Sequence, residues 1–97
     1  MENKEENKIC VKVRITGKVQ GVFYRAHTRK AAIEYGVSGY VKNCPDGSVE
    51  AVFQGNQDTI DQMIQWCQTG SPSSIVSDVL VEKRSDLTDF HNFEITY

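Results

Sequence analysis

The stretch GKVQGVFYR, from Gly17 to Arg25, separates two kinds of hydrophobic pattern. Before it, apolar and polar residues alternate from Ile9 to Thr16, which is the pattern of a strand with one buried face. From Tyr24 onward the apolar residues recur at helical spacing, and Gly36 ends that pattern. The order predicts a strand, a short loop and a helix, which restricts the folds that are open to the chain.

The glycine loop, defined here as Gly17 to Phe23, has the composition of an anion site. Its glycines, Gly17 and Gly21, allow positive φ angles and let the backbone approach a ligand closely. The helix that follows adds unpaired N–H groups and the positive end of its dipole, and Arg25 lies in its first turn. A guanidinium binds phosphate through a planar pair of donors. From spacing alone two interpretations stay open: a phosphate cradle, or a turn followed by an arginine that serves solubility.

The rest of the chain continues with two strands, a helix and a strand. A Pro-Asp-Gly turn between two β-rich runs is typical of a hairpin, because proline fixes φ, aspartate bonds its own backbone and glycine takes a left-handed conformation. The predicted elements are strands at Val37–Asn43, Ser48–Gly55 and Ile75–Lys83, a helix at Gln57–Gln68 with Asn56 as its N-cap, and a closing strand within FHNFEITY. Residues 1–7 are charged and lack periodicity, so we predict a flexible tail there and a single domain at 8–97.

This order of elements is that of a ferredoxin-like βαββαβ sandwich. We predict an α+β fold with a largely antiparallel sheet, two helices on one face and a short C-terminal strand. Alternating strands favour a sheet that is buried on one side only. Each helix has the single apolar stripe that such a sandwich requires, and 97 residues suffice for one core.

Charge and composition exclude several classes of protein. A net charge of -2 argues against a general nucleic-acid binder, which usually has a basic face. No apolar run has the length of a membrane span or a signal sequence, so we expect a cytoplasmic protein. We also expect it to be a monomer. The cysteines Cys10, Cys44 and Cys67 lack metal-ligand spacing, and their odd number favours free thiols. His27 has no second ligand at metal-binding spacing either, so no metal or other cofactor is expected.

Several blocks of the chain resemble the acylphosphatase family. These blocks are GKVQGVFYR, then Thr28 and GVSGYVKN (Gly36–Asn43), DGSVEAVFQG (Asp46–Gly55), GSPSS (Gly70–Ser74) and the closing FHNFEITY. Their order and spacing match that family over nearly all of the chain after the tail. The first block is the most specific one, because a ferredoxin-like order alone says little about function.

The resemblance implies an enzyme that hydrolyses acyl phosphates, the mixed anhydrides of a carboxylic and a phosphoric acid, without a metal. It implies a phosphate site formed by Gly17, Lys18, Val19, Gln20, Gly21, Val22, Phe23 and Arg25. Arg25 and Asn43 would be the catalytic residues, the first binding phosphate and the second positioning the attacking water. Inorganic phosphate or sulfate is the expected ligand of such a site. Tyr24 and Tyr40 stand where the family commonly has Phe and Trp, a departure that concerns packing and substrate preference more than the chemistry.

Two other functions stay open at this point. The same loop also suits a module that binds acyl phosphate or carbamoyl phosphate without turnover, as acylphosphatase-like domains do inside larger carbamoyl-transfer proteins. The presence of both Arg25 and Asn43 favours the enzyme. A ferredoxin-like nucleic-acid binder is disfavoured by the acidic balance of the chain and by strands that lack paired aromatic residues for base stacking.

Overall fold

The computed structural model describes residues 8–88 and 90–97, so the predicted tail at residues 1–7 lies outside the described residues. The elements are β1 (Lys8–Lys18), α1 (Tyr24–Tyr35), β2 (Ser38–Asn43), β3 (Val49–Asn56), α2 (Gln57–Thr69), β4 (Ile75–Arg84) and β5 (Phe93–Thr96). The predicted order of strands and helices is confirmed.

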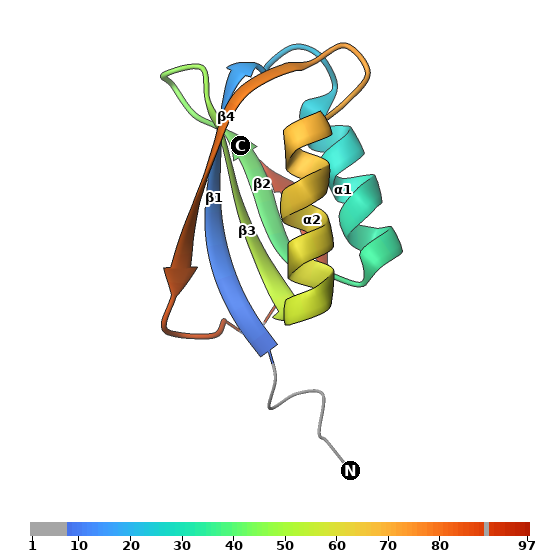
Figure 1. Ribbon diagram of the computed structural model, residues 1–97, viewed down its shortest axis with the longest axis vertical. Helices are drawn as coiled ribbons and strands as arrows, with labels where there is room; N and C mark the ends of the chain where they lie inside the picture. Colours follow the sequence, from blue (N-terminus) through green and yellow to red (C-terminus); the bar gives the residue numbers. More distant parts are fainter. Residues whose placement is uncertain (1–7, 89) are drawn as a thin grey trace.

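The strands form a single sheet in the order β4-β1-β3-β2-β5. Neighbouring strands are antiparallel, except that β5 runs parallel to β2. Both helices lie side by side on one face of the sheet (Figure 1). This is the predicted ferredoxin-like sandwich, with the short closing strand added at the β2 edge.

The core lies between the helices and the sheet because each element has one apolar face. Its strand positions alternate along β1 and β3, and its helix positions form one stripe on each helix. The members that illustrate this pattern are Val11, Val13, Ile15, Val49, Ala51, Phe53, Ala31, Ala32, Ile60 and Met63. Burying apolar side chains of the larger kind stabilises the fold by about 1.5–3 kcal/mol each.

The prediction that the sheet is buried on one side only is wrong for its centre. Six consecutive residues of β3, from Val49 to Gln54, are buried, so both faces of this strand are covered. The segment between β4 and β5 lies against the outer face at this point. The Gln54 side chain exchanges two hydrogen bonds with the backbone of Thr88, and the ring of Phe90 contacts that of Tyr40. The alternation of residues within β3 cannot show that its outer face is covered, because the covering segment between β4 and β5 is distant in the sequence.

The first strand extends further than its alternation predicts. Its pairing with β4 continues through Gly17 and Lys18, after a register shift between Thr16 and Gly17. Gly17 has a φ of 122°, and a Cβ at this position would collide with the carbonyl oxygen of Ile75. The shift leaves Ser77 as an extra residue of β4 opposite Thr16 and Gly17, which is a β-bulge in β4. Only glycine fits opposite this bulge, because the Ile75 carbonyl leaves no room for a Cβ at position 17.

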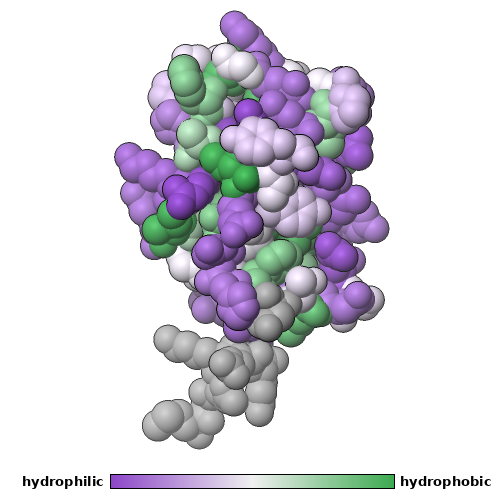
Figure 2. Space-filling view, turned by 180° about the vertical axis from the view of Figure 1, so that it is seen from behind, coloured by the Kyte–Doolittle hydropathy of each residue, from purple (hydrophilic) through white to green (hydrophobic). Residues whose placement is uncertain are grey.

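The surface opposite to the view of Figure 1 is largely hydrophilic, with hydrophobic side chains in small separate areas (Figure 2). Neither described helix is long and apolar enough to cross a membrane. The three cysteines are free, and Cys10 and Cys67 are buried. Burial raises the pKa of both thiols, that of Cys67 to about 12, so neither is a nucleophilic thiolate at neutral pH.

Candidate functional site

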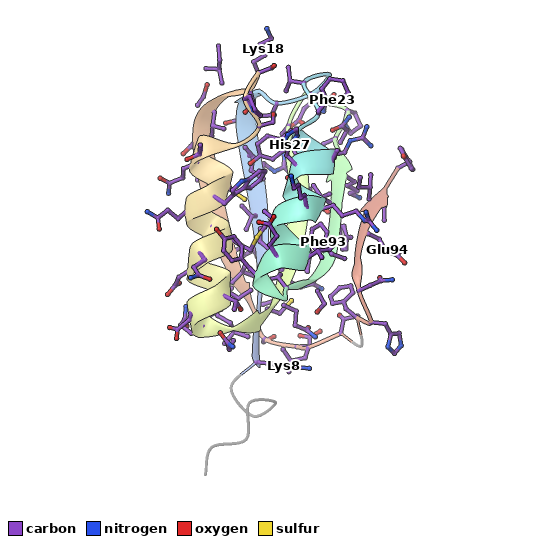
Figure 3. The ribbon with its side chains drawn as sticks, turned by 90° about the vertical axis from the view of Figure 1, so that its right-hand side faces the viewer. Lys8, Lys18, Phe23, His27, Phe93 and Glu94 are labelled. Atoms are coloured by element: carbon purple, nitrogen blue, oxygen red, sulfur yellow. The ribbon has the colours of Figure 1, made fainter. Side chains whose placement is uncertain are left out.

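Strand directions bring three distant parts of the chain to one end of the sheet. Both β1 and β2 are antiparallel to β3, and β5 is parallel to β2. The C-terminal ends of β1, β2 and β5 therefore lie at the same end of the sheet. The glycine loop follows β1 there, Asn43 ends β2, and Tyr97 follows β5. Figure 3 shows Lys18 and Phe23 at this end and Lys8 at the opposite one.

A cavity of about 360 Å³ opens between these parts. Its lining residues come from the glycine loop, the start of α1, the end of β2, and β5 with the residue after it. They are Val19, Gly21, Phe23, Tyr24, Arg25, Ala26, Asn43, Ile95 and Tyr97. Arg25 is the single charged side chain in this set, so the cavity combines a cation, a carboxamide and an apolar wall.

The backbone of the glycine loop is shaped for anion binding. Gly21 has a φ of 72°, and Phe23 is left-handed with φ 61° and ψ 22°, although it is not a glycine. A left-handed residue followed directly by helix forms a concave nest of consecutive N–H groups. The first turn of α1 carries no acidic residue, and no side chain in the described part of the chain caps its N-terminal N–H groups. These donors and the positive helix end therefore remain available to an anion.

Hydrogen bonds to two neighbouring connections anchor the glycine loop. The Oγ of Ser71 donates to the carbonyl of Val22 at 2.8 Å, and Val19 and Val22 are buried in the core. On the other side, the Nε2 of Gln20 donates to the carbonyl oxygens of Cys44 and Ser48, at 2.8 and 2.7 Å. The loop is thereby held between the α2–β4 connection and the β2–β3 hairpin.

Tyr24 anchors the helix start in the same region. Its ring packs against Trp66 with 5.5 Å between ring centroids, and its hydroxyl donates to the carbonyl of Cys67 at 2.9 Å. Burial raises the pKa of Tyr24 far above its usual value, so the hydroxyl stays a neutral donor. The first turn of α1 is therefore fixed against α2, next to Arg25.

Arg25 is half-buried and free to bind an anion. Its guanidinium carbon lies 5.1 Å from the centroid of the Tyr97 ring, and none of the carboxylates in the described part of the chain forms an ion pair with it. The ring face orients the guanidinium through a cation–π contact without neutralising its charge.

Asn43 presents an acceptor that no described residue satisfies. Its Oδ1 is buried, and within residues 8–88 and 90–97 no donor bonds it. Such a buried and unpaired oxygen costs about 1–3 kcal/mol. The carbonyl end of this side chain is consequently suited to a donor brought by a bound molecule.

The structure brings most, but not all, of the predicted site residues to the cavity. Val19, Gly21, Phe23, Arg25 and Asn43 line it, whereas Gly17, Lys18, Gln20 and Val22 do not. Gly17 and Lys18 belong to β1, Val22 is buried in the core, and both amide hydrogens of Gln20 point toward the hairpin carbonyls.

Ile95 and Tyr97 line the cavity, although the sequence indicates them only as parts of a closing strand. Alternation predicts the strand but not its partner. Parallel pairing with β2, which brings these residues next to Asn43, leaves no local signal in the sequence. Among the described residues, no group of three His, Cys, Asp or Glu side chains is placed to hold a metal ion.

Comparisons with known proteins agree with the resemblance in the sequence. The family model described as Acylphosphatase matches residues 11–95. The chain is 47% identical over 83 residues to an acylphosphatase of Syntrophobacter fumaroxidans, covering 86% of each chain. It is 55% identical over 76 residues to one of Haloquadratum walsbyi, covering 78% of this chain and 82% of that one. The solved structure of an acylphosphatase from Coxiella burnetii superimposes with a TM-score of 0.92 at 40% identity, covering 99% of this chain and all of that one.

Proposed function

The chain belongs to the acylphosphatase family and is an enzyme that hydrolyses acyl phosphates, and we propose that the cavity beside α1 is where it does so. One observation carries this proposal. An arginine and a carboxamide oxygen, both without a partner among the described residues, meet at a nest of backbone N–H groups. The loop matches the anionic phosphoryl group, the arginine balances its charge, and the carboxamide suits a water molecule.

Phosphate binding falls to the glycine loop and Arg25 in this proposal. Backbone N–H groups of the nest and the first turn of α1 would hold the phosphoryl oxygens. Arg25 would add a bidentate, charge-assisted contact, which is stronger than a neutral hydrogen bond. The geometry around Phe23 supports this, since its left-handed backbone turns the loop directly into the helix.

Asn43 would position the attacking water. Its buried Oδ1 accepts a hydrogen bond from a water O–H and fixes the direction of the oxygen lone pair. A carboxamide is too weakly basic to remove the proton early. Among the described residues that line the cavity there is no His, Asp or Glu, so we assign the proton to the phosphate of the substrate itself. A turnover rate that fell sharply on protonation of one enzyme group near neutral pH would contradict this assignment.

The reaction needs neither a strong acid nor a metal ion in this scheme. An acyl phosphate already carries a carboxylate as its leaving group, so holding the phosphoryl group, balancing its charge and placing the water suffice. The acyl part would lie against the apolar wall formed by Phe23, Ile95 and Tyr97. Because these contacts are non-directional, we expect tolerance for many acyl groups.

The test is hydrolysis of benzoyl phosphate by the purified protein in excess EDTA, with Arg25→Ala, Arg25→Lys and Asn43→Ala variants checked for folding. We expect EDTA to have no effect and each variant to lose about 100- to 1000-fold in turnover, the value of one preorganised contact to developing charge. Asn43→Ala should lower kcat more than it weakens inhibition by inorganic phosphate, since water positioning acts in the transition state.

Lys30→Ala is the control, because Lys30 is an exposed cation further along α1 and does not line the cavity. Full turnover by Asn43→Ala would overturn the water-positioning role. If the unaltered protein bound inorganic phosphate but hydrolysed nothing, the site would instead belong to a binding module for acyl or carbamoyl phosphate.

A further inference from the structure

Gln20 joins two parts of the site that belong to different elements. Its Nε2 lies 2.8 Å from the carbonyl oxygen of Cys44 and 2.7 Å from that of Ser48, and the side chain is half-buried. Cys44 directly follows Asn43 in the chain. We propose that Gln20 is a positioning residue that sets the place of Asn43 relative to the glycine loop, an inference that rests on the proposed function.

This contact uses both hydrogens of a primary amide. Its nitrogen carries two hydrogens, and the two carbonyl oxygens use both of them. The same two residues flank the turn of the β2–β3 hairpin and are bonded to each other there, the N–H of Cys44 donating to the carbonyl of Ser48 at 2.8 Å. The amide of Gln20 therefore binds the hairpin at the point where β2 ends, immediately beside Asn43.

The hairpin has its own supports and does not depend on Gln20 for its shape. The Oδ1 of Asp46 accepts from the backbone N–H and the hydroxyl of Ser48, at 3.0 and 2.6 Å. On the outer side, Arg14 pairs with the other carboxylate oxygen of Asp46 at 3.1 Å. What Gln20 adds is the connection between this turn and the glycine loop.

That connection matters because the phosphate site and the water site lie on separate segments. The loop and α1 would hold the phosphoryl group, while Asn43 would hold the water from the end of β2. In-line attack depends on the distance and angle between the two, and a misplacement of about 1 Å is enough to cost about 100-fold in rate. Loss of the Gln20 contact should therefore lower kcat. Phosphate affinity should stay nearly unchanged, because the buried Val19 and Val22 and the Ser71 hydrogen bond still hold the loop.

The first experiment compares Gln20→Met, which keeps the side-chain length but removes both donors, with Gln20→Glu, which replaces donors by acceptors. We expect kcat for benzoyl phosphate to fall about 10- to 100-fold in Gln20→Met and further in Gln20→Glu, with inhibition by inorganic phosphate changed less than about threefold. Gln57→Met is the matched control, because Gln57 donates to an exposed Asp61 at the start of α2, away from the cavity.

A double-mutant cycle with Asn43→Ala separates positioning from general structural support. If Gln20 acts through Asn43, Gln20→Met should cost little further turnover once Asn43 is alanine. Equal losses in both backgrounds, unchanged kcat in Gln20→Met, or unfolding of both Gln20 variants would overturn the inference. The proposed function fails by separate results: full turnover in Asn43→Ala would overturn the role of Asn43, and absence of hydrolysis by the unaltered protein would overturn the assignment of the cavity as the catalytic site.

Discussion

Three polar residues, Arg25, Asn43 and Gln20, lie in or beside the cavity, and each belongs to a different part of the fold. Arg25 and Asn43, which the sequence indicates through a family resemblance, line one cavity in the structure, while their catalytic roles remain predictions. Gln20 differs, because the sequence places it among the phosphate-binding residues and the structure directs its amide to the hairpin. Amide side chains bind whichever backbone groups the fold brings near them, so their partners are not encoded locally.

Gly17 offers a prediction at the scale of one residue. Gly17→Ala would combine a strained positive φ with a clash against the Ile75 carbonyl, whereas Gly36→Ala has a φ of 73° and no atom within 4 Å of the added Cβ. We expect Gly36→Ala to lower the free energy of unfolding by about 1 kcal/mol and Gly17→Ala by about 3 kcal/mol or more. Urea denaturation measures both, and equal losses would show that the bulge relaxes around a Cβ.

Among the elements, α2 follows its sequence signals closely. Asn56 caps it as predicted, its side chain accepting from the N–H of Thr59 at 3.0 Å, and the apolar stripe with Ile60 and Met63 faces the core. Helix α1 has no side-chain cap and starts from a left-handed Phe23. Thus α2, which starts away from the cavity, is capped by a side chain. Helix α1, which starts at the cavity, leaves its N-terminal N–H groups free for a ligand.

The cap of α2 gives a prediction at the scale of an element. Asn56→Ala should lower the free energy of unfolding by about 1 kcal/mol, the usual value of an N-cap, while Asn56→Asp retains it. Because Asn56 lies outside the cavity, KM and kcat for benzoyl phosphate should stay unchanged in both. Thermal or urea unfolding beside steady-state kinetics checks this, and a kinetic defect in a folded Asn56→Ala variant would contradict it.

At the scale of the whole molecule, a cluster of charged side chains on the sheet face opposite the helices links the three strands β1, β2 and β3. The side chain of Glu50 accepts from the hydroxyl of Tyr40 at 3.0 Å and lies 3.4 Å from Lys12 and 3.7 Å from Lys42. Burial raises the pKa of Glu50, but the Tyr40 hydrogen bond and the two lysine charges outweigh it, so the pKa lies below its ordinary value of 4.5. The carboxylate is thus stabilised in its charged form by β1, β2 and β3 together.

This cluster predicts how stability depends on pH. A lowered pKa in the folded state means that the contribution of Glu50 is present above about 4.5 and is lost as the pH falls through the folded value. At pH 7, Glu50→Gln should be less stable by about 1–2 kcal/mol. Because Asp46, whose pKa is also lowered, is present in both proteins, the comparison isolates Glu50.

Urea denaturation at pH 7 and pH 3 measures the difference in stability between the unaltered protein and Glu50→Gln. The gap should narrow at pH 3, because the Glu50 contribution is lost as the pH falls through its lowered pKa. A gap of the same size at both pH values would mean that packing at Glu50, and not its charge, stabilises the sheet.

The order of the elements, the faces that pack in the core between helices and sheet, the helix ends and the glycines of the loop could all be predicted from the sequence, because periodicity and backbone chemistry act over a few residues. Tertiary structure alone decided which strands are neighbours. The parallel pairing of β5 with β2 set Ile95 and Tyr97 beside Arg25 and Asn43, and the loop before β5 covered the outer face of β3. Contacts of this kind depend on the path of the whole chain, so no local pattern reveals them.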